Sequence, residues 1–178
     1  MLRKIINYVY WKYYKNSVKT KLAFLKLKYS NRVSIAPDLL FRRRFKILVI
    51  GNGKLSIGTG CFFNNDCSIN CMGEISISNN TIFGENVKFY DHNHRFSDHK
   101  VLIKNQGYKV GSIKVGENCW IGSNVTILKD VIIGDNVIIG ANCLINKSIP
   151  SNTIVRLQSN LILEEKRIKM SNGDTNLH

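Results

Sequence analysis

Hydrophobic and polar residues follow a six-residue pattern through the second half of the chain. From Ile113 to Ile154 the sequence divides into seven consecutive hexads without a remainder. The first and third residues of each hexad are nearly always aliphatic or Cys, which is the period-two pattern of a short strand with one buried face. Gly, Asn, Asp and Ser predominate in the last three positions, where they favour sharp turns. The pattern therefore predicts short strands joined by tight corners.

The same frame extends toward the N-terminus. Six further hexads begin at Leu55, Cys61, Cys67, Ile75, Thr81 and Val87, with a two-residue slip at residues 73–74. A strand of about three residues cannot bury its face alone, so these units are expected to stack on their own copies as a parallel β-helix. Residues 33–54 are interpreted as an irregular first turn with an Arg-rich excursion at residues 42–44.

One such domain with two appendages accounts for the 178 residues. We expect a basic, aromatic-rich N-terminal arm at residues 1–32, the β-helix at residues 33–156 and a short helical tail at residues 157–178. The β-helix is expected to carry one excursion loop, at residues 93–112.

Core packing is the favoured role for the five cysteines. Cys61, Cys67, Cys119 and Cys143 occupy the first, inward position of their hexads, whereas Cys71 is expected in a turn. No C-x-x-C pair is present, which argues against a redox or metal site and fits a reducing cytoplasm.

Positive charge is concentrated in the first 46 residues, which hold 13 Lys or Arg against one Asp. Their net charge is +12, out of +14 for the whole chain. No apolar run here reaches the roughly 18 residues of a membrane-spanning helix, and the segment lacks a signal-peptide core.

Three interpretations of this basic arm remain open. Its aromatic residues at partly helical spacing fit a helix that packs on the β-helix or on a neighbouring subunit. They also fit an interfacial helix held to anionic lipid through residues 1–29. Nucleic-acid binding ranks last, and no nucleic-acid partner is expected, because no recognised binding motif accompanies a three-residue Arg run.

The interruption at residues 93–112 is the strongest candidate for chemistry. Loops on rigid scaffolds often carry function, and His92, His94 and His99 all lie at its start. A neutral imidazole, with a pKa of about 6.5, is suited to take a proton from a hydroxyl group. His92 and His94 are therefore candidate catalytic bases, whereas His99 is interpreted as an ordinary polar loop residue.

Trp120 is a second unusual residue. It takes the second, outward position of its hexad just after the interruption, which indicates a subunit contact or one wall of a ligand site. Ser123 and Ala141 lie 18 residues apart and are expected to stack on one edge. Lys129 and Lys147 have the same spacing, which suits anion binding as well as it suits solvated surface lysines.

These features resemble the bacterial hexapeptide-repeat acyltransferases, and among them the galactoside, maltose, virginiamycin and polysaccharide O-acetyltransferases. The resemblance covers about residues 47–155 and rests on the hexads, the His-bearing loop and Cys-Trp-Ile-Gly-Ser-Asn followed by Val-Ile-Ile-Gly-Ala-Asn. It implies an all-β fold, a left-handed parallel β-helix, although crossovers between parallel strands are almost always right-handed. It also implies a homotrimer with acetyl-CoA as co-substrate in clefts between subunits.

The resemblance assigns roles to individual residues. The family's catalytic histidine falls on the Asp-His-Asn-His segment, where the preceding residue favours His92 and an ungapped count favours His94. Cofactor-binding positions fall on Trp120, Ser123, Ala141 and Lys147. Acceptor-binding positions are expected at Tyr90, Asp91 and Trp120.

One segment departs from the family's pattern. The chain after the last hexad reads Val-Arg-Leu-Gln-Ser-Asn from Val155, in place of the usual Gly-Asn-Pro-Ala type of turn with a basic residue. The contacts to the CoA phosphates are therefore unassigned, with Arg156, Lys166 and Arg167 as possible replacements.

The implied function is acetyl-CoA-dependent O-acetylation of a sugar hydroxyl, in the synthesis of a surface polysaccharide such as capsule or lipopolysaccharide. An N-acetyltransferase of an amino sugar and a transferase for a small free acceptor, such as a sugar or antibiotic, are alternatives. A zinc-dependent β-helix of the γ-carbonic-anhydrase type is a further alternative, but the repeats outside the loop hold no His, and no metal is expected. The expected location is the cytoplasm, at the inner face of the membrane where the arm could attach.

Overall fold

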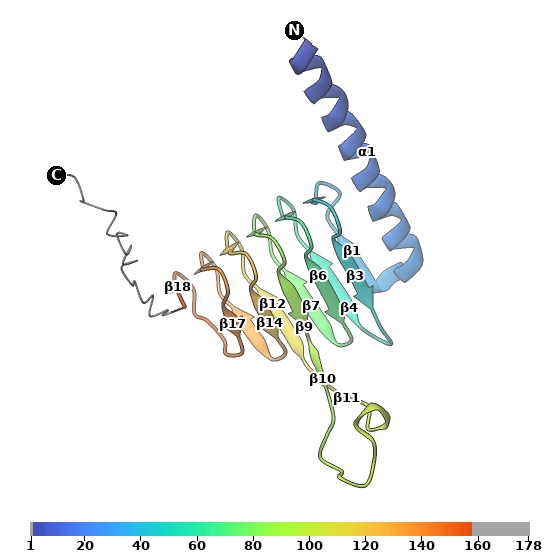
Figure 1. Cartoon of the computed structure of the whole chain (residues 1–178), viewed down its shortest axis with the longest axis vertical. Helices are drawn as coiled ribbons and strands as arrows, with labels where there is room; N and C mark the ends of the chain where they lie inside the picture. The colour runs from blue at the N-terminus through green and yellow to red at the C-terminus, as the bar shows by residue number, and fades with distance from the viewer. Residues whose placement is uncertain (1, 158–178) are drawn as a thin grey trace, which may run out of the picture.

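The computed structural model describes residues 2–157, which form a three-sided coil of short strands preceded by one long helix (Figure 1). The helix α1 spans Leu2–Tyr29 and is followed by a 3-10 turn, η1, at Ser30–Arg32. The expected helical tail lies outside the described residues, apart from Leu157. All the strands of the three coil sheets pair in parallel with the turn above or below.

Each face of the coil is one sheet. Sheet A contains β1 (Val33–Ile35), β4 (Lys54–Ile57), β7 (Glu74–Ile77), β12 (Ser112–Val115) and β15 (Val131–Ile133). Sheet B contains β2 (Leu40–Phe41), β5 (Phe62–Phe63), β8 (Ile82–Phe83), β13 (Trp120–Ile121), β16 (Ile138–Ile139) and β18 (Ile154–Val155). Sheet C contains β3 (Lys46–Val49), β6 (Ser68–Cys71), β9 (Lys88–Tyr90), β14 (Thr126–Leu128) and β17 (Leu144–Ile145).

The register confirms the hexad frame. Ile113 pairs with Val131, 18 residues later, so one regular turn is three hexads long. Ile75 pairs with Ile113 although 38 residues separate them, because the excursion leaves and rejoins the coil at the same corner. The coil is left-handed, as the family resemblance implied.

Asparagines hold two corners of the coil. Asn86, Asn124 and Asn142 each have a positive φ, near 58–63°, a conformation that Asn tolerates better than most residues. Their side-chain amides form a ladder: Asn86 Nδ2 donates to Asn124 Oδ1 at 2.9 Å, and Asn124 Nδ2 donates to Asn142 Oδ1 at 3.0 Å. A second ladder joins Asn118, Asn136 and Asn152. The sixth position of the hexad is therefore occupied for its backbone conformation and for its stacking.

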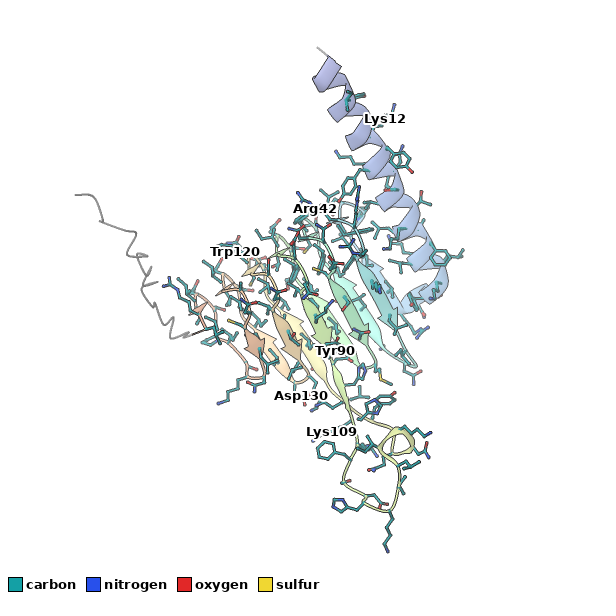
Figure 2. The ribbon with its side chains drawn as sticks, in the orientation of Figure 1. Lys12, Arg42, Tyr90, Lys109, Trp120 and Asp130 are labelled. Carbon is teal, nitrogen blue, oxygen red and sulfur yellow. The ribbon has the colours of Figure 1, made fainter. Side chains whose placement is uncertain are left out.

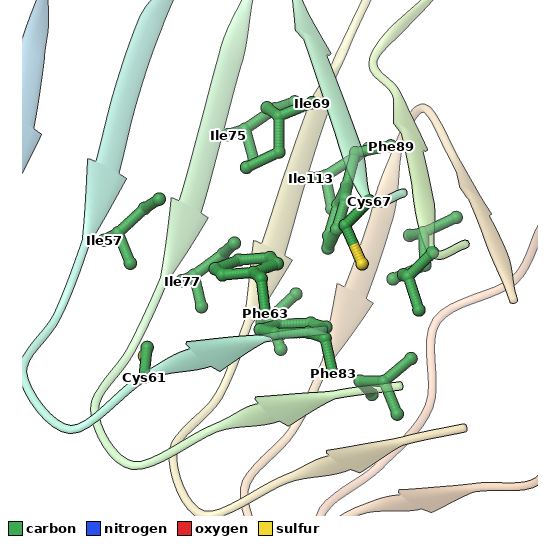
Figure 3. Close-up of a cluster of buried hydrophobic side chains, with 14 of the residues drawn as sticks. Ile57, Cys61, Phe63, Cys67, Ile69, Ile75, Ile77, Phe83, Phe89 and Ile113 are labelled. Atoms are coloured by element: carbon green, nitrogen blue, oxygen red, sulfur yellow. The ribbon is translucent and has the colours of Figure 1, made fainter. Parts of the chain in front are cut away.

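The interior is apolar along the whole coil. Its N-terminal half holds a stack of phenylalanines, in which the rings of Phe63 and Phe83 lie 4.2 Å apart and nearly parallel (Figure 3). The C-terminal turns replace these rings with Ile and Val. As predicted, the cysteines of the first hexad position are buried in this interior.

Cys71 differs from the prediction. It ends strand β6 and is fully buried, rather than lying in a turn, because β6 runs one residue further inward before the corner. Its thiol donates to the Lys54 carbonyl oxygen at 3.2 Å.

The first turn is also more regular than predicted. Residues 42–44 are not an excursion but the ordinary corner between β2 and β3. Arg44 adopts a positive φ of 59° there, and its guanidinium pairs with both carboxylate oxygens of Asp66 on the next turn.

Helix α1 covers the N-terminal end of the coil with one face. Val18, Leu22, Leu25 and Tyr29 recur at helical spacing and are buried against the first turn. The Lys21 ammonium donates to the Phe45 carbonyl oxygen. The N-terminal half of the helix projects beyond the coil (Figure 1).

Candidate active site

The excursion begins as a two-stranded antiparallel hairpin below the coil (Figure 1). Strand β10 (His92–His94) pairs with β11 (Tyr108–Val110), and a 3-10 turn, η2 (Ile103–Asn105), lies in the loop between them. The frame is therefore left at residue 92 and regained when β12 begins at Ser112.

Asp91 fixes the base of this hairpin. Its side chain is fully buried, and its carboxylate oxygens accept hydrogen bonds from the backbone N–H groups of Met72 and Gly73 at 2.8–3.0 Å. Its own carbonyl oxygen accepts a hydrogen bond from Gly111 N at 2.7 Å. One residue thus joins a corner of the previous turn to both ends of the excursion.

Gly73 is required by the close approach at this point. A Cβ atom there would lie 2.2 Å from the Gly111 carbonyl oxygen and 2.7 Å from Val110 Cγ1. Any larger residue would push the hairpin away from the corner that donates to Asp91.

The same carboxylate orients His92. Asp91 Oδ1 lies 2.9 Å from His92 Nδ1, and the His92 side chain is 15% exposed. Because a carboxylate only accepts hydrogen bonds, this pair places the ring proton on Nδ1 and leaves Nε2 as a proton acceptor. A histidine held in this way is suited to general-base catalysis.

Tyr108 completes the hairpin's His-bearing face, and sequence reasoning missed it. Its ring lies edge-on to His92, with centroids 5.4 Å apart, and 4.5 Å from the ring of His94. His92 and His94 are two residues apart on one strand, so both side chains share a face of the hairpin. The only available signal was that Tyr108 lies on the return of the excursion, which does not specify its partner.

The expectation that Asp91 binds the acceptor is wrong. Its carboxylate has no exposed surface and is surrounded by the donors named above, so it acts on His92 and not on a bound molecule. Tyr90, by contrast, points outward from β9 and is 37% exposed.

Trp120 is exposed as predicted, with 54% of its surface accessible, but it does not adjoin the excursion. It lies on sheet B, whereas Tyr90 and Lys109 lie at the opposite edge of the coil (Figure 2). Together with Ile82, Ile138 and neighbouring asparagines, Trp120 lines a shallow pocket of about 390 Å³. A single chain therefore does not bring Trp120 and His92 together.

The predicted edge stacks are present, and their ligand roles remain predictions. Ser123 and Ala141 lie at the same corner, where the N–H of Asn142 donates to the Ser123 carbonyl oxygen at 2.9 Å. Lys147 is exposed. Lys129 is less available than the sequence suggested, because its ammonium pairs with the Asp130 carboxylate.

Two further searches of the described residues bear on the site. Within residues 2–157, no group of three or more His, Cys, Asp or Glu side chains is arranged to hold a metal ion. In the same range, α1 and the shorter turns lack the combined length and apolarity of a membrane-crossing helix.

Comparisons with known proteins match this architecture. The family model for bacterial transferase hexapeptide (six repeats) matches residues 112–147. A maltose O-acetyltransferase from Clostridium difficile 630 is 31% identical, with a TM-score of 0.55 over 64% of this chain and 60% of that chain. A galactoside acetyltransferase solved with coenzyme A is 29% identical, with a TM-score of 0.52 over 68% of this chain and 58% of that chain.

A hexapeptide-repeat acetyltransferase from Vibrio cholerae shares the fold over a longer stretch. It is 22% identical, with a TM-score of 0.62 over 76% of this chain and 74% of that chain. The chain spans about three fifths of the length of the maltose and galactoside enzymes. The repeats, the left-handed coil and these matches show that the chain belongs to the bacterial hexapeptide-repeat transferase family.

Proposed function

We propose that the protein is an acetyl-CoA-dependent O-acetyltransferase that modifies a sugar hydroxyl. The observation that carries this proposal is the buried Asp91 carboxylate bonded to His92 at the base of the excursion. The similarity to a maltose O-acetyltransferase and to a galactoside acetyltransferase supports the reaction class and the sugar acceptor.

The proposed mechanism is direct transfer. His92 Nε2 removes the proton from the acceptor hydroxyl while its oxygen attacks the thioester carbonyl carbon of acetyl-CoA. The tetrahedral intermediate then collapses, the C–S bond breaks, and the CoA thiolate receives the proton. The products are the acetyl ester and CoA, without a covalent enzyme intermediate. An amino group on the acceptor would react in the same geometry, giving the N-acetyltransferase alternative.

Variants of the two hairpin histidines test this proposal. CoA release is measured with purified protein, acetyl-CoA and a panel of neutral, amino and phosphorylated sugars. We expect His92→Ala to lower kcat by about 10²–10⁴-fold, the usual contribution of a general base. His94→Ala keeps the Asp91–His92 pair and is expected to lose less than about tenfold, a smaller loss than that of a general base. Full activity in both variants would contradict the mechanism.

We further propose that acceptor binding requires a homotrimer. Trp120 lies on a different face of the coil from His92, so a channel that uses both residues needs a neighbouring subunit. In that arrangement Ser123, Ala141 and Lys147 of one subunit would face the excursion of the next, with acetyl-CoA between them. Sedimentation of the purified protein tests the assembly, and a monomer at assay concentrations would count against it.

The proposed setting is polysaccharide synthesis at the inner face of the membrane. The exposed side of α1 carries Ile6, Tyr13, Phe24 and Leu27, whose spacings return to one side of the helix, opposite the buried face. Lysines flank this stripe, as expected for an interfacial helix on anionic lipid. Flotation with phosphatidylglycerol vesicles tests this. Tyr13→Ser with Leu27→Ser should abolish flotation, and equal flotation of the variant would refute the attachment.

A further inference from the structure

A basic groove lies between α1 and sheet C, away from the hairpin histidines. It has a volume of about 680 Å³ and is lined by the C-terminal half of the helix and by the outward residues of β3, β6 and β9. Its cations are Lys21, Lys28, Arg44, Lys46 and Lys88. The sequence analysis noted the basic arm but did not place it against these strand residues.

The positive charge of this groove is only partly balanced. Asp66 is the one carboxylate in its lining, and the Arg44 guanidinium already holds both of its oxygens. Lys21 and Lys88 each donate to a backbone carbonyl oxygen, of Phe45 and Asp66 respectively. An ammonium group has three N–H donors, so each retains donors for a ligand. The lining residues therefore leave four lysine charges without a carboxylate partner.

The remaining lining suits a sugar. Phe24 and Tyr90 provide aromatic surface, and Ser68 and Asn70 provide hydroxyl and amide groups between them. Tyr90 lies two residues before His92 along the chain. At about 3.3 Å per residue, Lys88 and His92 are about 13 Å apart along the strand direction, a span that a short glycosyl unit can bridge.

We propose that this groove binds the phosphate or diphosphate of a glycosyl phosphate acceptor, with the sugar directed past Tyr90 toward His92. This assignment rests on the proposed acetyl transfer and narrows its acceptor to a phosphate-bearing sugar. Two sources carry this chemistry, a soluble nucleotide diphosphate sugar and a lipid-linked glycosyl diphosphate. Lysines are well suited to both, because they bind phosphate as compact point charges.

The test measures equilibrium binding, which does not require catalysis. Uridine diphosphate glucose, a short-chain polyprenyl diphosphate glucose and methyl glucoside are titrated by calorimetry into full-length protein. The variant is Lys46→Gln with Lys88→Gln, which removes two charges and keeps side-chain length. The matched control is Lys114→Gln, an exposed strand lysine on sheet A outside the groove.

We expect the double variant to weaken binding of both diphosphates by about tenfold or more, since each close charge pair contributes about 1 kcal/mol even in water. The control should bind like the wild type, and added salt should reduce the difference. The diphosphate with the lower Kd identifies the source of the acceptor. Equal affinity for methyl glucoside and the diphosphates, or unchanged affinity in the double variant, would overturn the proposal.

Two other outcomes separate this proposal from its neighbours. If the wild type binds the diphosphates in this lysine-dependent way but transfers no acetyl group, the groove stands and the proposed reaction fails. If the double variant binds the diphosphates normally but no longer floats with phosphatidylglycerol vesicles, the lysines serve membrane attachment and the groove proposal is overturned.

Discussion

At the scale of single residues, Asp91 has the most consequential position in the described chain. It would be an ordinary turn residue if it were exposed. Here its burial forces every polar atom to find a partner, and the partners belong to three segments: the preceding corner, the excursion and the return of the excursion. Orientation of His92 is thus a consequence of folding and is in place before any ligand binds.

Replacing Asp91 with Asn tests this role. The amide keeps the shape but brings two N–H donors toward the Met72 and Gly73 N–H groups, so it can no longer accept all of the hydrogen bonds. We expect kcat to fall by about 10²–10⁴-fold, as for loss of a correctly held base, with the Kd for acetyl-CoA unchanged. Asp98→Asn, in the exposed part of the excursion, is the control. A kcat close to that of the wild type would contradict the orienting role.

The cysteines predict a pH dependence of stability. Burial raises the pKa of the Cys71 thiol to about 12, with a further contribution from the nearby Asp91 charge. Burial likewise raises the pKa of Cys61, Cys67 and Cys119. In the unfolded chain these thiols ionise first as pH rises, so their contribution to stability is complete below about pH 8.5 and is lost toward pH 12.

Thermal unfolding followed between pH 7 and 10.5 measures this effect. The Tm should fall above about pH 8.5, and a Cys71→Ser variant should show a smaller fall than the wild type. In native protein at pH 8 the described thiols should also resist alkylation, because buried thiols stay protonated. Rapid labelling of all five cysteines without denaturant would show that the packing is wrong.

At the scale of elements, the corners stabilise the coil as much as the strands do. A two- or three-residue strand forms few ladder hydrogen bonds, so the geometry of the turn decides whether successive strands stack. The asparagine ladders satisfy the backbone demand for positive φ and link each turn to the next through side-chain amides.

Asn124 is the central member of one ladder and gives a direct test. Asn124→Ala removes two side-chain hydrogen bonds and leaves Ala at a φ of 59°, at a total cost of about 2–3 kcal/mol of unfolding free energy. Asn124→Gly restores the backbone freedom and should cost about 1 kcal/mol less than Ala. Asn105→Ala, in the excursion, is the control. Chemical denaturation measures all three, and equal stability of the Ala and Gly variants would exclude the conformational contribution.

Element by element, much of the fold could be predicted from the sequence. The hexads specify strand positions, inward residues and the 18-residue turn because all three follow from local alternation and turn chemistry. The failures lie where packing overrides that frame. Cys71 was read as a turn residue because the slip at residues 73–74 hid the length of β6, and the Arg42–Arg44 corner was read as an excursion because it carries charge instead of Asn or Gly.

The site was only partly predictable for a different reason. The clustering of His92 and His94 located the excursion, but the choice between them depends on which imidazole meets a buried carboxylate. That contact is decided by Met72, Gly73 and Gly111, which are distant from one another in sequence. The contribution of Tyr108 depends on hairpin register in the same way.

At the scale of the whole molecule, the separation of Trp120 from His92 determines how a complete site could form. If each site takes its histidine from one subunit and its tryptophan from the next, two inactive variants can complement each other. We expect His92→Ala and Trp120→Ala proteins, each strongly impaired alone, to regain activity when unfolded and refolded together. In random mixed trimers about one quarter of the sites would hold both wild-type residues. Simply mixing the folded proteins is the control, and no recovery after refolding would exclude a shared site.

The pairing of Ile75 with Ile113 across the excursion has a consequence for how such a protein can change. The coil neither supplies nor needs the residues between His94 and Tyr108, because the strands on either side meet in register without them. Acceptor preference can therefore be rewritten in that segment by insertion, deletion or exchange while the hydrophobic interior is untouched. Stability and specificity are encoded in separate stretches of one chain, so each can be altered without a compensating change in the other.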